Sequence, residues 1–434
     1  MNQPGVNQLG VNQLGVNQLG LRSHNAALVL DLLRTAGAEG ISRLELADRT
    51  GLTPQAVSKI TARLREEGLA AEAGRRASTG GKPRTVLRLV PEAGHAVGVH
   101  LDRDELRGVL VDLDGAVVGE RCVEMDLGAG AGAVVEGVAG LVEGLLAELR
   151  SGSGSGPVGS GTARAEGWAR AGLAEGVRSE SRPSSAGAEW RPGSGSTEPP
   201  TPMPSRIPTP TPTSTPPPTV LGLGVALPGP LDHRRGVLHR VTGFPEWDGF
   251  PLRDALARRL GIPVVVDKDT NAAALGLAVG DAADSFAYLH LGTGLGAGLV
   301  IGGTVHRGAR TGAGEFGHQV IQLDGPVCGC GNRGCVEALC LAAVGRGDVA
   351  EAARVLGAGA ANLVGLLDID VVLLGGRTVA AAPEVFVRGV RAVLEERARG
   401  EGAVPVRVAP GGTRGVAEGA AQLLLAPLFG RSDG

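Results

Sequence analysis

Aromatic side chains, lysines and long hydrophobic runs are all scarce in this chain. Aromatic residues make up 2% of its 434 residues, so its cores are expected to rest on Leu, Val and Ala. No apolar run reaches the roughly 18 residues that a membrane-spanning helix needs, and the polar N-terminus lacks the apolar core of a signal peptide. The net charge of −3 excludes a chain that is basic throughout. These absences predict a cytoplasmic protein without a membrane segment, and the length suits two or three domains.

Cysteine is also scarce, and three of the five cysteines stand close together, after a histidine, in the segment GHQVIQLDGPVCGCGNRGC. One imidazole and three thiolates form the closed tetrahedral ligand set of a structural Zn²⁺ site. The alternative is a group of buried free thiols. The spacing favours zinc, and the predicted ligands are His318, Cys328, Cys330 and Cys335. The other two cysteines, Cys122 and Cys340, are expected to be small core residues.

Two stretches have compositions unsuited to a packed core. Residues 2–20 repeat a five-residue unit, so residues 1–20 are expected to form a flexible tail. Residues 151–219 are roughly two-thirds Gly, Ser, Thr or Pro, which is typical of disorder. The flanks of this stretch look like incomplete α/β structure, so we expect an insertion within one domain. A linker between independent domains is the alternative.

Residues 21–90 carry the pattern of a winged helix-turn-helix domain. A first helix is expected from Ser23 to Ala36. A capping box at Ser42 and Glu45 starts a second helix, and a third runs from Pro54 to about Glu67, with proline at its first position. Two extended segments then enclose the loop GRRASTGGKPR, which is typical of a wing.

Positive charge in this region gathers on the last helix and the wing, the two elements that such domains place on DNA. An ordinary solvated face is the alternative. We expect the domain to bind double-stranded operator DNA as part of a homodimer or a dimer of dimers. The predicted contacts are Gln55, Ser58, Lys59 and Arg63 on the helix, and Arg75, Arg76, Lys82 and Arg84 in the wing.

Residues 91–150 and 220–434 alternate strand and helix signals, which predicts a mixed α/β architecture. Gly292, Thr293 and Gly294 form a glycine-rich turn of the kind that approaches phosphate closely. Asp269 follows a strand, where α/β folds place functional carboxylates. Glu315 and Glu337 flank the predicted zinc ligands, so a zinc-organised loop would hold both carboxylates rigidly.

Five motifs in these regions occur in the order seen in ROK proteins, a family of sugar kinases and sugar-responsive repressors. They are PGP (228–230), DKDTNAAALG (267–276), LGTGLGAGLV (291–300), GAGEFGH (312–318) and CGCGNRGCVEA (328–338). The chain therefore resembles a ROK protein with the winged helix of the repressor branch. The resemblance implies a two-lobed fold of the actin-like ATPase type, interrupted here by the disordered insertion, with a sugar bound in the cleft.

The resemblance also assigns roles to single residues. Asp269 matches a carboxylate that is the catalytic base in the kinases and a sugar ligand in the repressors. Glu315 and Glu337 match acceptors of sugar hydroxyls, and His318 matches a residue that binds zinc and faces the sugar. Lys268 stands where the family usually has Asn, which bears on the identity of the sugar.

One departure from the family pattern favours the repressor branch. Family kinases hold ATP phosphates with an Asp-x-Gly-Gly-Thr loop, whereas residues 100–104 here read HLDRD. Added negative charge would repel a polyphosphate. We therefore predict a sugar-responsive transcriptional regulator, most simply a repressor, that is not an enzyme. The alternatives are an ATP-dependent sugar kinase with an added DNA-binding domain and a DNA-binding remnant without ligand.

Overall fold

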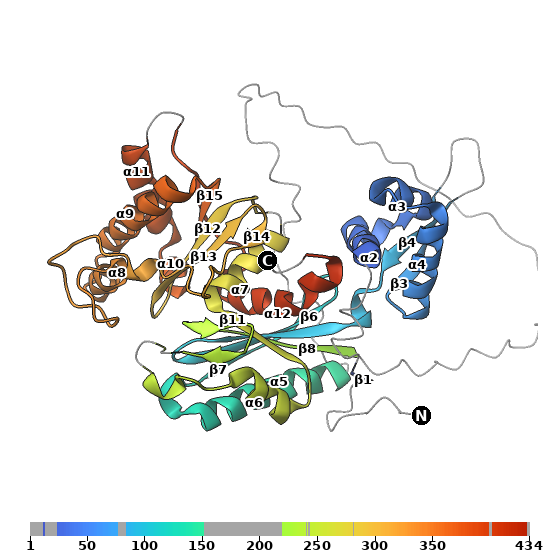
Figure 1. Cartoon of the computed structure of the whole chain (residues 1–434), viewed down its shortest axis with the longest axis horizontal. Coiled ribbons are helices and arrows are strands. Elements are labelled where there is room, and N and C mark those ends of the chain that lie inside the picture. Colours follow the sequence, from blue (N-terminus) through green and yellow to red (C-terminus); the bar gives the residue numbers. More distant parts are fainter. Residues whose placement is uncertain are drawn as a thin grey trace, which may run out of the picture. The chain divides into compact units, whose positions relative to one another are not determined.

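The computed structural model describes residues 12–13, 24–76, 84–151, 219–239, 241, 244–280, 282–398 and 402–431 (Figure 1). The predicted tail at 1–20, except residues 12 and 13, lies outside the described residues. So does the predicted insertion at 151–219, except its two end residues. Lys82 and the side chain of Arg76, both predicted DNA contacts, are also outside them.

The N-terminal winged helix-turn-helix domain has the expected elements. Its helices are α2 (His24–Ala36), α3 (Arg43–Thr50) and α4 (Pro54–Glu66), and its sheet has the order β2 (Ile41–Ser42), β4 (Arg84–Leu89), β3 (Ala70–Arg76). The predicted capping box is confirmed, since the Glu45 backbone N–H donates to Ser42 Oγ at 3.3 Å and the Ser42 backbone N–H donates to Glu45 Oε2 at 2.8 Å. Thr53 caps α4 in the same way, because the Ala56 backbone N–H donates to its hydroxyl.

The first lobe is built on a six-stranded sheet. Its strands are β1 (Asn12–Gln13), β5 (His95–Leu101), β6 (Glu105–Asp112), β7 (Val117–Glu124), β8 (Thr219–Leu227) and β11 (Val264–Lys268). β5 pairs in parallel with β8, although residues 102–218 separate them in the chain. The strands before and after residues 151–219 therefore share one sheet. Figure 1 shows α5 (Ala131–Ser151) and α6 (Leu252–Leu260) on one face of this sheet and α12 (Gly415–Leu425) on the other.

The second lobe has a five-stranded sheet with the order β14, β13, β12, β15, β16. These strands are β12 (Phe286–Leu291), β13 (Leu295–Ile301), β14 (Thr304–Val305), β15 (Val371–Gly375) and β16 (Val406–Val408). Alternate residues of β12 enter different cores. Phe286 and Tyr288 pack with α7 (Asp269–Val279) and α12, whereas Ala287 and Leu289 pack with helices on the opposite face. Those helices are α8 (Val336–Gly345), α9 (Val349–Leu367) and α11 (Pro383–Arg397).

α9 is long and apolar enough to cross a membrane by length and composition alone. In this fold it is a core helix, because Ala352, Leu356 and Ala360 are buried in the same cluster as Phe386 and Val390 of α11. A buried helix of a globular domain needs the same apolar composition as a membrane span.

Two details differ from the sequence predictions. The apolar pattern at 297–305 predicts a single strand, but the structure has a hairpin there, because Gly302 and Gly303 adopt left-handed φ angles of 56° and 74° and turn the chain between β13 and β14. Cys122 is not a core residue, since it lies in the exposed second half of β7, where its thiol is 3.7 Å from Glu105 Oε2. Cys340 is buried, as expected.

Candidate functional site: a His/Cys3 cluster beside an interlobe cleft

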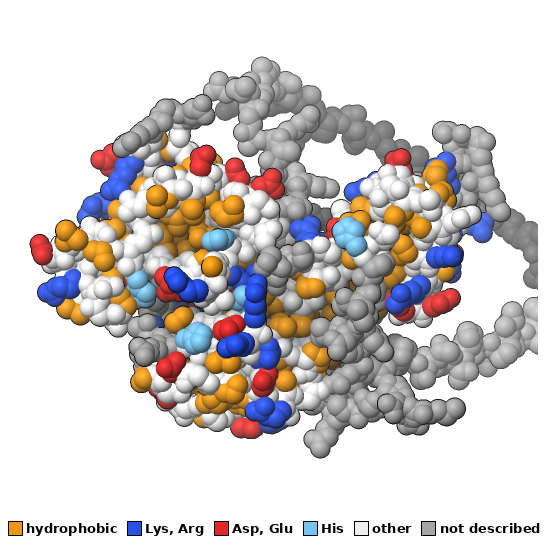
Figure 2. Space-filling view, in the orientation of Figure 1, with side chains coloured by type: hydrophobic (Ala, Val, Ile, Leu, Met, Phe, Trp, Pro, Cys, Tyr) orange, Lys and Arg blue, Asp and Glu red, His pale blue; other side chains and the backbone are white. Residues whose placement is uncertain are grey.

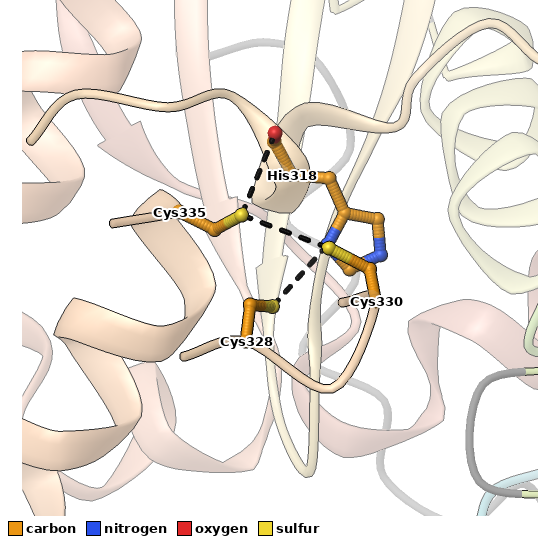
Figure 3. Close-up of side chains that lie close together, drawn as sticks. All are labelled: His318, Cys328, Cys330 and Cys335. Carbon is orange, nitrogen blue, oxygen red and sulfur yellow. Dashed lines mark hydrogen bonds between the residues drawn. The ribbon is translucent and has the colours of Figure 1, made fainter. Parts of the chain in front are cut away.

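The four predicted metal ligands come together in the second lobe (Figure 3). The ligand atoms of His318, Cys328, Cys330 and Cys335 all lie within 4.8 Å of one another. The Cys330 and Cys335 sulfur atoms are 3.7 Å apart, and Cys328 Sγ is 3.7 Å from His318 Nδ1. A tetrahedral ion with Zn–S bonds of about 2.3 Å needs S···S separations of about 3.8 Å. The cluster is therefore the right size to hold a metal ion.

Local backbone structure brings the ligands together. The Cys328 backbone N–H donates to the Asn332 carbonyl at 2.8 Å, and the Gly334 N–H donates to the Pro326 carbonyl at 2.8 Å. Gly334 has a left-handed φ of 65°, and a Cβ there would overlap the Gln322 carbonyl oxygen. Only glycine fits this reversal, which places Cys335 at the start of α8.

The carboxylates predicted to bind sugar line one cavity with the metal-cluster histidine. Its walls include Asp269 at the start of α7, Glu315 before a short 3-10 helix, His318 at the end of that helix, and Glu337 in the first turn of α8. Glu337 is anchored, because its Oε2 accepts a hydrogen bond of 2.8 Å from the Leu295 backbone N–H. Four residues from three segments of the sequence thus line one cavity.

Lys268 enters the same cavity and ties down one of its carboxylates. The Lys268 side chain is 5% exposed, and its ammonium donates to Glu315 Oε1 at 2.9 Å and to the Ala313 carbonyl at 2.8 Å. The sequence alone marked Lys268 only as a departure from the family pattern. Its pairing with Glu315 leaves Glu315 Oε2 as the oxygen that is not engaged by the ammonium.

Burial changes the protonation of groups around the cavity. It raises the pKa of Asp269, and His290 and Lys268 oppose that rise by favouring the carboxylate. Burial also lowers the pKa of His100 to about 4, so this histidine is neutral at pH 7. His290 Nδ1 lies 2.9 Å from the Tyr288 hydroxyl, which fixes the orientation of its ring.

The loop at 100–104 makes ion pairs with the second lobe. Arg377, at the start of α10 (Arg377–Ala381), donates to Asp104 Oδ1 at 2.6 Å and to Asp102 Oδ2 at 3.2 Å. The Thr293 hydroxyl of the glycine-rich turn donates to Asp102 Oδ1 at 2.9 Å. Burial acts to raise the pKa of Asp102, but His100, the Arg103 N–H, Thr293 and Arg377 together lower it. Arg377 is not among the residues predicted from the sequence, and only its position after the glycines at 375–376 could have drawn attention to it.

The predicted DNA contacts on α4 lie on one exposed face, while Val57, Thr61 and Leu64 are buried on the other. Arg63 pairs with Glu67 at 2.8 Å within the exposed face. Arg75 of β3 and Arg84 of β4 are both exposed at the base of the wing. The predicted contacts Gln55, Ser58, Lys59 and Arg63 are all exposed.

Comparisons with known proteins match both parts of the chain. A family model for winged helix-turn-helix DNA-binding matches residues 29–70, and the ROK family model matches residues 214–347. A xylose repressor from Caldicellulosiruptor bescii is 23% identical over 401 residues, which cover 82% of this chain and 84% of that protein. A glucokinase from Thermotoga maritima is 41% identical over 121 residues, only 27% of this chain and 38% of the enzyme.

A solved structure has the same fold over nearly the whole chain. It is a ROK family transcriptional regulator, a homolog of the E. coli MLC protein, with a TM-score of 0.64 and 18% identity, and the match covers 94% of this chain and 98% of that one. At this identity the likeness shows the fold alone. The two family models show that the chain contains a ROK family domain and an N-terminal winged helix-turn-helix domain.

Proposed function

We propose that this protein is a sugar-responsive transcriptional repressor that binds operator DNA through its winged helix. The observation that carries the proposal is the presence, in one chain, of a winged helix with exposed basic residues on its last helix and a cleft lined by three carboxylates. Relatives named xylose repressors that match most of this chain support it. Such a regulator acts in the cytoplasm.

The DNA-binding proposal rests on α4 and the wing. Lys59 and Arg63 are exposed on the helix face that such domains place in the major groove, with Gln55 and Ser58 beside them. Arg75 and Arg84, with Arg76 and Lys82 of the wing, are proposed to contact phosphate or the minor groove. Half-site recognition requires a homodimer or a dimer of dimers.

The sugar proposal rests on the cleft. Asp269, Glu315 and Glu337 are proposed to accept hydrogen bonds from sugar hydroxyls, with His318 alongside them. Zn²⁺ held by His318 and the three cysteines is the proposed structural ion, because thiolate and imidazole ligands at tetrahedral spacing suit zinc. The ion would fix the loop that connects Glu315 to Glu337.

Coupling between the two sites needs a physical connection, and the C-terminal end of the chain offers one. Val29, Leu30 and Leu33 of α2 share a hydrophobic core with Leu428 and Phe429, which directly follow α12. α12 in turn packs on α7, the helix that begins with Asp269. A sugar that draws the lobes together is proposed to shift α12 and thereby the winged helices.

An ATP-dependent sugar kinase is the second candidate, because glucokinases match part of the chain at up to 41% identity and Asp269 stands where the family kinases have their base. Against it, Asp102 and Asp104 occupy the phosphate loop and pair with Arg377. Gly292, Thr293 and Gly294 are proposed to be a residual phosphate loop. Incubation with ATP, Mg²⁺ and a panel of hexoses and pentoses tests this candidate, and turnover above the background rate would support it.

The repressor proposal is tested by DNA binding with and without sugar. A duplex is selected from a random-sequence pool by the protein, and its affinity is measured by gel shift while xylose and other sugars are titrated. Couplings of this kind are typically about 5- to 150-fold in affinity. Glu315→Gln should keep DNA binding and lose the sugar response, whereas Glu384→Gln, an exposed residue of α11, should behave as the wild type. A Glu315→Gln protein with a normal response contradicts the proposed site.

Two further variants locate the DNA interface. Lys59→Gln with Arg63→Gln should weaken binding to the selected duplex and reduce its salt dependence, because two phosphate or base contacts are lost. Arg258→Gln, which changes an exposed arginine of α6, is the matched control. Equal affinity and salt slope in the α4 variant and in the control would refute the assignment of α4 to DNA.

A further inference from the structure

A second cavity, of about 800 Å³, lies outside the proposed sugar site. It is lined by the hairpin of β9 (Leu231–Asp232) and β10 (Val237–Leu238) and by the segment 304–311, which includes β14. No residue that the structure describes lines both this cavity and the sugar cleft. Its volume falls within the range of about 300–1,000 Å³ that is typical of small-molecule sites.

The lining of this cavity is strongly biased toward groups that bind anions. Among the described residues that line it, Asp232 is the single carboxylate. The basic lining residues are His233, Arg234, His239, His306, Arg307 and Arg310. Figure 2 shows Lys, Arg and His side chains, with Asp and Glu among them, over the region where Figure 1 draws β11. Guanidinium groups present several donors in a fixed plane, an arrangement that matches phosphate oxygens.

Two of these arginines are available to a ligand. Arg234 and Arg310 are exposed, and among the residues that the structure describes neither forms an ion pair with a carboxylate. Arg307 is different, because its side chain is 5% exposed and pairs with Asp267 at 2.7 Å. The pair fixes one wall of the cavity while Arg234 and Arg310 keep their charge uncompensated.

The histidines do not form a metal site. Among the described residues, the one group of three or more possible ligands with converging atoms is the His318 cluster. The backbone of two of the histidines that line the cavity is held in place. The His306 N–H donates to the Leu299 carbonyl at 2.7 Å, and the His239 N–H donates to the Pro230 carbonyl at 3.0 Å. A hydrogen bond of 2.7 Å from Thr311 Oγ1 to the Leu231 carbonyl joins the two walls. The histidines therefore line the cavity from segments whose backbone is held in place.

We propose that this cavity binds the phosphate ester of a small metabolite, held by Arg234 and Arg310 with the histidines completing the donor set. The site would communicate with the sugar cleft through Asp267. That carboxylate accepts from Arg307 on the cavity side and from the Lys268 backbone N–H, at 2.7 Å, on the cleft side. Lys268 in turn holds Glu315. This second site is independent of the proposed function, since it requires neither DNA nor sugar.

Calorimetric titration of the full-length protein with inorganic phosphate, glucose 6-phosphate and AMP tests the proposal, at an ionic strength held constant with NaCl. We expect saturable binding of at least one phosphate ester. Arg234→Gln combined with Arg310→Gln should weaken it at least tenfold, because two charge-assisted contacts are removed. Arg258→Gln serves as the control for the loss of a surface arginine and should bind as the wild type does.

The outcomes separate the sources of phosphate and the location of the site. Preference for glucose 6-phosphate or AMP over inorganic phosphate identifies an ester, whereas equal affinity for all three means that the phosphate alone is recognised. The proposal would be overturned if none of the three probes shows saturable binding up to roughly 10 mM. Unchanged affinity in the double variant would overturn it as well. Displacement of the bound ester by a short non-operator duplex would overturn it in favour of a nucleic-acid contact. Operator binding and the sugar response are measured separately, so their failure would leave this result unaffected.

Discussion

The buried ion pair between Asp267 and Arg307 gives the sharpest quantitative prediction. Their side chains are 3% and 5% exposed, and Asp267 Oδ2 accepts from Arg307 Nε at 2.8 Å and from Arg307 Nη2 at 2.7 Å. Asp267 Oδ1 accepts from the Lys268 N–H at 2.7 Å and from Asn271 Nδ2 at 3.0 Å. Four donors therefore converge on one carboxylate in the interior.

Asp267→Asn removes the charge and turns an amide NH₂ toward groups that are themselves donors. Removing one partner of a buried pair leaves the other charge uncompensated, which costs about 3–5 kcal/mol. For a domain of this size each kcal/mol shifts the melting temperature by roughly 2–4 °C. The expected decrease is therefore about 6–20 °C. Asp254→Asn is the control, because it breaks an exposed ion pair in which the Arg253 and Asp254 side chains are 34% and 50% exposed. It should lower the free energy of unfolding by less than about 1 kcal/mol.

Differential scanning calorimetry of the three proteins at pH 7 measures these shifts, and circular dichroism checks that Asp267→Asn retains native secondary structure. The double variant Asp267→Asn/Arg307→Met removes the orphaned guanidinium and should recover part of the loss, since neighbouring substitutions of this kind are non-additive. If the melting temperature of Asp267→Asn lies within roughly 2 °C of the wild-type value, as is expected for Asp254→Asn, the argument from buried charge is refuted.

Three further predictions concern the metal, the buried histidine and the interlobe contact. Cys330→Ser should lose zinc, as measured by elemental analysis, and with it the sugar response, while α2, α3 and α4 stay folded. Full zinc content in the variant would exclude Cys330 as a ligand. Because burial lowers the pKa of His100 from 6.5 to about 4, the unfolded chain binds the proton first as the pH falls, so about 3 kcal/mol of stability is lost between pH 6.5 and 4. His100→Leu should flatten that loss in urea unfolding, and an unchanged pH profile would contradict the assignment. Asp104→Asn should cost less than about 1 kcal/mol, since Arg377 and Asp104 are 41% and 57% exposed. A loss above roughly 2 kcal/mol would mean that the contact is stronger than exposed pairs are.

Local features of the fold were predictable because short-range geometry determines them. The capping box of Ser42 and Glu45 and the N-cap at Thr53 depend on residues three positions apart, whose hydrogen bonds follow from helix geometry. The hairpin at Gly302 and Gly303 was missed, because a glycine pair inside an apolar run also fits a continuous strand. Cys122 was misplaced because strand periodicity does not reveal where a strand leaves the core.

The sequence by itself determined the chemistry of the cluster and of the cleft. A histidine and three cysteines within eighteen residues can be brought together by local turns, independently of the rest of the fold. The family motifs identified Asp269, Glu315 and Glu337 as candidate residues of the cleft. Only the tertiary structure decided which charges meet. Lys268 and Glu315 are 47 positions apart, and Arg377 and Asp104 are 273 apart. Such pairs depend on how the two lobes and their helices pack, and packing at that range arises from the whole core, whereas sequence spacing constrains only near neighbours.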